Sequence, residues 1–250
     1  MTTPAARAGD DRAFPDVGID AFLSHFIVAV RFHAGDRAGD LVTFSLPSAV
    51  QTVARSRPFV PAEDGERAVF RLPEGATLAD EVGRDDFLVS PRGFFAQDRE
   101  QVWLQILNLD ARGETPFGPV RVILGETFKR EYPDLFQPSF GAAQSLGERG
   151  FPARLFFSPN AVIETPLGAW KTRPKALVGA EIGEFPPIGS YPSLQEPVPL
   201  DAVESLRALD DPLAPGSLAP VATISALAHP IDAVVHDAQE AFTAIQRSLS

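Results

Sequence analysis

The stretch "QVWLQILNLDARGETPFGPVRVILGETF" (101–128) decides the fold. In its first part the side chains alternate between two faces of an extended chain: Val102, Leu104 and Ile106 on one, and Trp103, Gln105 and Leu107 on the other. A second apolar run, "PVRVILGETF", follows the turn residues "TPFG". Two alternating runs joined by a short turn predict an antiparallel β-hairpin.

The turn of this hairpin recurs later in the chain. Thr115-Pro116-Phe117-Gly118 is followed by Thr165-Pro166-Leu167-Gly168, which lies in a second predicted β region over 154–182. Proline presets the backbone at the second turn position, and glycine accepts the positive φ that such turns require. The residues that flank the two turns share little, so the repeat indicates a turn used twice rather than a duplicated ligand loop.

The segment "AFLSHFIVAVRFH" (21–33) also alternates with a period of two. One face is apolar and holds Phe22, Phe26, Val28, Val30 and Phe32. The other face is mixed and holds Leu23, His25, Ile27, Arg31 and His33. This pattern predicts a strand with one buried face, paired through a loop with a second strand at 41–47.

Short β-rich runs separated by turn signals predict a mainly β protein: an antiparallel barrel or sandwich of short strands joined by hairpins, with one C-terminal amphipathic helix. We expect a disordered leader over residues 1–18 and a β-rich domain over 19–185. A proline-rich segment over 186–229 is predicted to wrap or connect, and residues 230–250 are predicted to form the helix.

The predicted helix rests on a helical period in the tail. Its apolar residues gather on one side, and they are Ile231, Val234, Val235, Ala238, Phe242 and Ile245. Pro230 is suited to the first turn of a helix. The apolar side must pack against the body or against another subunit, so a homo-oligomer formed through this helix is a candidate assembly.

Composition excludes several classes of function. The net charge of −11 and the lack of a dense basic block argue against nucleic acid or an anionic membrane as partners. The absence of cysteine excludes disulfides, thiolate metal sites and thiol nucleophiles. Arg-rich and Lys-poor usage points to a bacterial source. No apolar targeting segment is visible, so we expect a soluble cytoplasmic protein.

Neither a metal site nor a cofactor is predicted. His25 and His33 share a face of one strand, but eight residues separate them by roughly 26 Å. His229 and His236 would lie about 10 Å apart along a helix, again too far for one ion. No glycine-rich phosphate loop follows a strand into a helix, so no nucleotide cofactor is expected.

The candidate ligand-binding residues depend on which way the mixed face of 21–33 points. If it faces the lumen of a barrel, His25, Arg31 and His33 are the polar groups of a cavity, and aromatic residues such as Trp103 form its walls. Tyr132, just beyond the first hairpin, is then a candidate for the mouth. If the face points outward, the same polar residues are solvated.

Three functions remain open. The first is a β-barrel or sandwich that binds a small apolar ligand, which the many phenylalanines and the lack of catalytic motifs favour. The second is a motif-less isomerase, cyclase or lyase of specialised metabolism, with one acid–base residue in a shaped pocket. The third is an assembly or interaction protein that uses its C-terminal segment.

Overall fold

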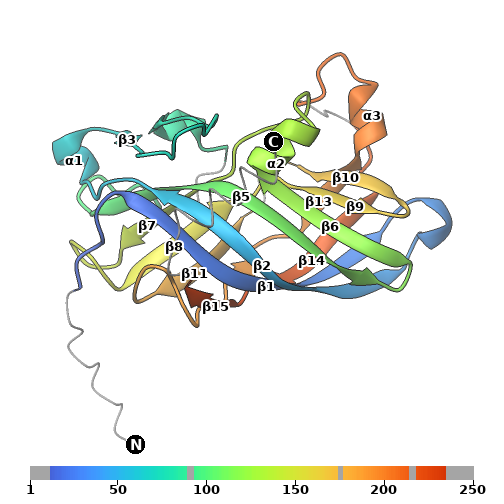
Figure 1. The fold of residues 1–250 in the computed structure, drawn as a ribbon, viewed down its shortest axis with the longest axis horizontal. Helices are drawn as coiled ribbons and strands as arrows, with labels where there is room; N and C mark the ends of the chain where they lie inside the picture. The colour runs from blue at the N-terminus through green and yellow to red at the C-terminus, as the bar shows by residue number, and fades with distance from the viewer. Residues whose placement is uncertain (1–11, 89–92, 174–176, 214–217, 235–250) are drawn as a thin grey trace, which may run out of the picture.

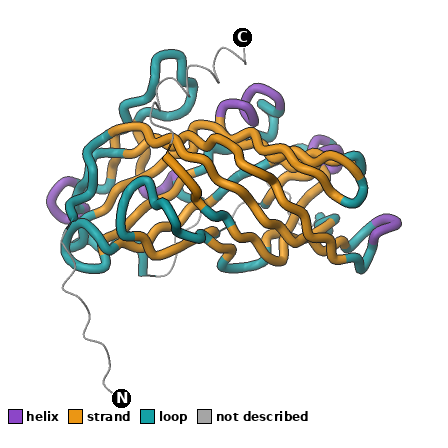
Figure 2. The backbone as a smooth tube through the Cα atoms, turned by 60° about the horizontal axis from the view of Figure 1, so that its bottom comes forward, coloured by secondary structure: helices purple, strands orange, loops and turns teal. Residues whose placement is uncertain are grey.

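One antiparallel sheet of thirteen strands closes on itself in two places (Figures 1 and 2). The computed structural model describes residues 12–88, 93–173, 177–213 and 218–234. The strands of the sheet are β1 (Gly18–Phe32), β2 (Leu41–Arg55), β5 (Gln101–Thr115), β6 (Gly118–Gly125), β7 (Phe140–Ser145), β8 (Ala153–Ser158), β9 (Val162–Thr165), β10 (Gly168–Thr172), β11 (Val178–Ile182), β12 (Ser193–Leu194), β13 (Val198–Ala202), β14 (Ala222–Ala228) and β15 (Ile231–Val234). Outside this sheet lie the hairpin β3 (Arg67–Val69) and β4 (Glu81–Gly83), and the helices α1 (Pro61–Asp64), α2 (Glu126–Glu131) and α3 (Val203–Arg207). The predicted mainly β, antiparallel architecture is confirmed.

The wall of the barrel divides at β5. The first part of β5, Gln101–Gln105, pairs with β7, and its last part, Asn108–Thr115, pairs with β6. From β5 the sheet therefore runs two ways, through β6, β9, β10 and β13 or through β7, β8, β11 and β12. We call these the β6 branch and the β7 branch. Both return to β14, which pairs with β1 and completes two closed rings that share β14, β1, β2 and β5.

The repeated T-P-x-G sequences form matching hairpin turns. In the first turn, the Thr115 hydroxyl accepts from the backbone N–H of Phe117 at 3.3 Å and donates to the Gly118 carbonyl at 2.7 Å. Thr165 makes the same two bonds in the second turn, at 3.1 and 3.0 Å. The glycines have φ values of 116° and 129°. The prediction of one turn chemistry used twice is confirmed.

The apolar face of β1 points into the barrel. Its members, Phe22, Phe26, Val28, Val30 and Phe32, are buried in the main core with inward residues of β2, β5, β13 and β14. The alternation continues without a break from Phe22 to Phe32, while the pairing of β1 with β2 shifts by one residue between Ser24 and Phe26. The mixed face therefore points outward, which answers the question that the sequence left open.

Two further clusters cover the outside of the wall. The segment between β2 and β5 folds over the β7 branch, and rings from that segment pack on Trp103, Phe140 and Phe156 (Figure 1). On the β6 branch, α2 and α3 cover Ile123 and Val162. The first part of β5 is thus buried on both faces, as its two apolar faces require.

Three of the predicted boundaries differ from the structure. Within the predicted leader 1–18, Phe14 is buried against Phe151 and near Phe185, while residues 1–11 lie outside the described residues. The proline-rich segment 186–229 supplies β12, β13 and β14, and is therefore part of the barrel.

The helix predicted over 230–250 is wrong at its start. Residues Ile231–Val234 form β15 and pair with Phe22–Ser24 of β1. The pairing of β14 with β1 ends at Ala228, so the edge of β1 beyond it is free to accept another strand. This tertiary pairing overrides the local helical period. The remainder of the predicted helix, 235–250, lies outside the described residues. None of the described helices has the length and apolar character needed to cross a membrane.

Candidate functional site

An apolar cavity lies inside the barrel, where the two branches separate. Its volume is about 80 Å³. At roughly 30 Å³ for each water molecule in the liquid, this is space for about two or three waters, or for a ligand portion of similar size. Twenty residues line it: Phe26, Val28, Phe44, Leu46, Gln51, Ile106, Leu109, Val122, Leu124, Phe157, Pro159, Ala161, Ile163, Thr172, Val178, Leu194, Val198, Ile224, Leu227 and His229.

The fork in the wall explains where this space is. The chain crosses from one branch to the other after β6, β8, β10 and β12. Residues beside each crossing line the cavity, among them Pro159, Thr172 and Leu194. Because the strands diverge there, the side chains must span a wider interior than in a single ring. Val122, Phe157, Leu194 and Leu227 line the cavity and are only partly buried, which is what incomplete filling produces.

Aromatic and ionic groups close the barrel on either side of the cavity. At one end Phe32 makes edge-to-face contacts with Phe117, from the first T-P-x-G turn, and with Trp170; their ring centroids are 6.0 and 5.5 Å away. At the other end Phe14 packs on Phe151, and Arg55 forms a largely buried ion pair with Asp20. The cavity is therefore a central chamber between two packed ends.

The polar groups of the cavity are few and unevenly satisfied. The Thr172 hydroxyl accepts from the backbone N–H of Ala161 at 2.9 Å. In contrast, Gln51 Oε1 and His229 Nε2 are buried and make no hydrogen bond within the described protein. The His229 ring stacks on Phe26 with centroids 4.1 Å apart and planes inclined by 16°.

His229 is uncharged near neutral pH. Burial lowers its pKa to about 3, since the charged ring would lose its hydration, and the neighbouring His25 adds to the effect. Among the described residues, no Asp, Glu, Lys or Arg side chain lines the cavity. The chamber therefore offers apolar contacts and two neutral polar atoms that lack partners.

The polar residues predicted on the mixed face of β1 lie outside the cavity. His25 Nδ1 is 2.8 Å from Asp232 Oδ2, and His33 Nε2 is 2.7 Å from the Thr223 hydroxyl; both contacts are on the outer surface. Arg31 is exposed. None of these three predicted residues lines the chamber.

Trp103 and Tyr132, the other two predicted residues, also lie outside the chamber. Trp103 is buried under the outer cover of the β7 branch, where its Nε1 donates to Gln101 Oε1 at 3.1 Å. Tyr132 follows α2 and donates to Glu164 Oε1 at 2.7 Å. Burial and this hydrogen bond raise the pKa of Tyr132 to about 12.

The two polar chamber residues that were not predicted, Gln51 and His229, are only weakly indicated by the sequence. Gln51 stands in the apolar run "AVQTVA" (49–54), where a polar side chain on an inward face requires an explanation. His229 precedes a proline and follows a β run, and nothing in the local sequence indicates that it turns inward. Their association requires β1, β2 and β14 to be neighbours, which is a long-range property.

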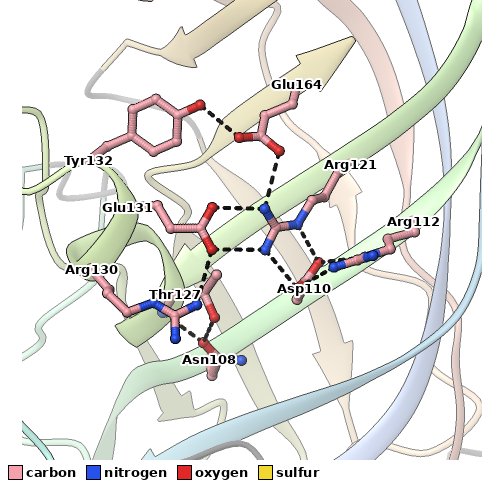
Figure 3. A network of polar contacts seen from close by, with 9 residues as sticks. All are labelled: Asn108, Asp110, Arg112, Arg121, Thr127, Arg130, Glu131, Tyr132 and Glu164. Atoms are coloured by element: carbon pink, nitrogen blue, oxygen red, sulfur yellow. Dashed lines mark hydrogen bonds and ion pairs between the residues drawn. The ribbon is translucent and has the colours of Figure 1, made fainter. Parts of the chain in front are cut away.

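An extensive polar network lies on the outer wall of the β6 branch, centred on Arg121 (Figure 3). The Arg121 guanidinium donates twice to Asp110, at 2.8 Å each, and twice to Glu131, at 2.7 and 3.0 Å. A further bond reaches Glu164 at 3.2 Å. The network ties together β5, β6, β9 and α2, since each strand or helix contributes one of these side chains.

The carboxylates of this network are held in the charged form. Burial alone would raise the pKa of Asp110, but hydrogen bonds from Arg121 and Arg112 outweigh it and hold that pKa below its ordinary value. The hydrogen bond from Arg121 likewise lowers the pKa of Glu131. Because each of these carboxylates is paired with Arg121, we interpret the network as a structural connection of three strands and α2.

The described part of the chain contains no group of three or more His, Asp or Glu side chains placed to hold a metal ion. Besides the chamber and the Arg121 network, the described polar groups include the buried Lys171, whose pKa burial lowers to about 8, and the ion pair of Arg173 with Asp201.

No protein-family model and no curated protein sequence matches the chain. Among solved structures, the chain is similar to DynF from the dynemicin biosynthesis pathway of Micromonospora chersina. The superposition has a TM-score of 0.55 and covers 96% of this chain and 93% of DynF. The two chains share a fold. At 15% identity, the likeness to DynF concerns the arrangement of the strands and not the residues of the chamber.

Proposed function

We propose that the barrel binds a small apolar molecule in its central chamber. The observation that carries this proposal is a space inside the barrel lined by seventeen apolar residues, together with two buried polar atoms that lack partners among the described residues. Native proteins rarely leave a buried polar atom unsatisfied, because each one costs about 1–3 kcal/mol. A bound molecule that completes these bonds explains why the sequence retains them.

The chemistry of the lining favours a ligand over ordered water alone. A water in a protein interior normally makes about three hydrogen bonds, whereas apolar cavities stay dry and accept apolar guests. Most of the chamber surface is aliphatic or aromatic. A ligand larger than the present space of about 80 Å³ would require movement of partly buried rings such as Phe157.

The shared fold with DynF, a protein of a biosynthesis pathway, is compatible with a role in specialised metabolism. An isomerase, cyclase or lyase would require an acid–base residue in the chamber. His229, with a pKa of about 3, is a weak base near neutral pH, which disfavours this alternative. The assembly function depends on residues 235–250, outside the described part of the chain.

Native mass spectrometry of the protein purified from its own host tests the proposal. We expect an adduct that is removed by organic extraction and is apolar. The variant Ala161→Leu, which places added carbons in the chamber, is expected to lose the adduct. The matched control Ala169→Leu changes the opposite face of the same wall and is expected to keep it.

Two results of this experiment would contradict binding in the chamber. A protein that carries no adduct and binds none of a panel of small aromatic and aliphatic molecules would overturn the proposal. Equal binding by the two variants would place the ligand elsewhere and would also overturn it.

A further inference from the structure

Two of the buried polar atoms that have no hydrogen-bond partner among the described residues belong to side chains that line the chamber, and they are Gln51 Oε1 and His229 Nε2. They come from β2 and from the residue that follows β14, and both of these strands pair with β1. Other buried atoms of this kind, such as those of Gln105 and Ser145, belong to residues outside the chamber lining. On the opposite side of the chamber, the Thr172 hydroxyl is satisfied by backbone atoms. The chamber thus has one polar side and an otherwise apolar lining.

The identity of these atoms limits what can satisfy them. The carbonyl oxygen of Gln51 requires a hydrogen-bond donor. The neutral imidazole of His229 presents Nε2 as a donor or an acceptor, according to its tautomer. A hydroxyl group has one donor and two acceptor sites, so it satisfies both atoms at once when His229 carries its proton on Nε2: it accepts from His229 and donates to Gln51 Oε1. A ketone or ether accepts only and leaves Gln51 Oε1 unsatisfied.

The charge of the chamber limits the ligand further. A carboxylate or an ammonium group would lose its hydration on entry and would find no opposite charge among the described lining residues. The hydrogen bond between His25 and Asp232 lies on the outer surface. The chamber therefore disfavours fatty acids and amines relative to uncharged molecules of the same size.

We propose that the ligand is an uncharged apolar alcohol or phenol whose hydroxyl group faces Gln51 and His229. Its apolar part lies against the two branches, where Leu109, Ile163 and Phe157 form the lining. This inference rests on the proposed function and adds the chemical class of the ligand. It also assigns His229 and Gln51 as the residues that select that class.

Isothermal titration with three probes tests the inference. Phenol and toluene have nearly the same shape and differ in one hydroxyl, and benzoate adds a charge. We expect phenol to bind about 3–10-fold more tightly than toluene, the equivalent of one net hydrogen bond, and benzoate to bind least. The variant His229→Phe keeps a ring against Phe26 and is expected to prefer toluene.

Two controls keep the test independent of folding. His33→Phe makes the same substitution on the outer surface and is expected to bind like the unmodified protein. In the unmodified protein, nitrogen-15 spectra of the four histidines are expected to show the Nε2 signal of His229 moving with phenol and not with toluene. This second readout needs no variant.

The outcomes separate the two proposals. If phenol and toluene bind equally well and His229→Phe changes neither affinity, the assigned ligand class is wrong while binding in the chamber stands. Tightest binding of benzoate would also overturn the ligand class. If no probe binds, the proposed function fails and this inference fails with it.

Discussion

The polar groups of the chamber and those of the outer Arg121 network differ in how completely they are hydrogen-bonded. On the outer wall, Arg121 donates to three carboxylates, and Tyr132 completes the set through Glu164 (Figure 3). In the chamber, Gln51 and His229 are more deeply buried and yet have atoms without partners. A fully paired network stabilises a fold by itself. A buried group without a partner lowers stability unless another molecule completes it.

The comparison separates structural groups from binding groups. The sequence alone offered His25, Arg31, His33, Trp103 and Tyr132 as candidate ligand contacts, the first three on condition that the mixed face of β1 points into the barrel. The structure favours two residues whose hydrogen bonds are incomplete. Three predictions test this distinction, and they are given in order of expected effect.

The largest effect concerns His229 and pH. Its pKa is about 3 in the folded chain and near the ordinary 6.5 in the unfolded chain, so the unfolded state binds the proton first. The neutral ring therefore makes its full contribution to the free energy of unfolding above about pH 6.5. Below that pH the free energy of unfolding falls by about 1.4 kcal/mol per pH unit, or roughly 2.5 kcal/mol by pH 4.5. Urea unfolding from pH 7 to 4.5 measures this slope.

His229→Phe is expected to reduce that slope, and His33→Phe is expected to retain it. Asp110 and Glu131 of the Arg121 network have lowered pKa values. Their contribution to the free energy of unfolding is therefore present above about pH 4.5 and is lost only below it. If stability falls with pH as steeply in His229→Phe as in the unmodified protein, the buried imidazole is not neutral. That result would remove the contrast between His229 and the Arg121 network.

The second effect concerns the centre of the outer network. Arg121→Met leaves Asp110, Glu131 and Glu164 without their shared cation, and we expect a loss of about 2 kcal/mol in the free energy of unfolding. Arg112→Met is the matched control, since this side chain is 73% exposed and is expected to change stability by less than about 0.5 kcal/mol. Equal losses in the two variants would contradict a structural role centred on Arg121.

The smallest effect compares two buried amides. Asn108 Oδ1 accepts from the backbone N–H and the hydroxyl of Thr127 at 2.9 and 2.8 Å, whereas Gln51 Oε1 accepts nothing. We expect Asn108→Leu to destabilise the ligand-free protein by about 1–2 kcal/mol and Gln51→Leu to stabilise it by about 0.5–1 kcal/mol. Thermal unfolding of the two variants provides the measurement. A change in stability of the same sign in both variants would show that Gln51 Oε1 has a hydrogen-bond partner.

The strands that could be predicted are those whose signal is local. Alternation in "AFLSHFIVAVRFH" identified β1 and separated its apolar face from its mixed face, and the T-P-x-G residues identified two turns. The division of β5 between two partners could not be predicted, because a strand buried on both faces has no polar face to orient it. The strand β15 was also missed, since only the free edge of β1 makes Ile231–Val234 extended.

The candidate site was less predictable than the fold. The alternation placed Phe26 and Val28 on one apolar face of the strand, but a pattern of apolar residues does not distinguish a filled core from a chamber. The space arises from the fork at β5 and from the crossings after β6, β8, β10 and β12. Its polar side arises from contacts between segments far apart in the sequence.

A titration of the protein with toluene, followed through the methyl signals of Val, Leu and Ile, tests the central claim most directly. The account predicts shifts at Leu109, Val122, Ile163 and Leu227, which line the chamber, and unchanged signals at the exposed Val69 and Leu213. Unchanged signals in the chamber at saturating toluene, or shifts confined to the outer surface, would contradict it.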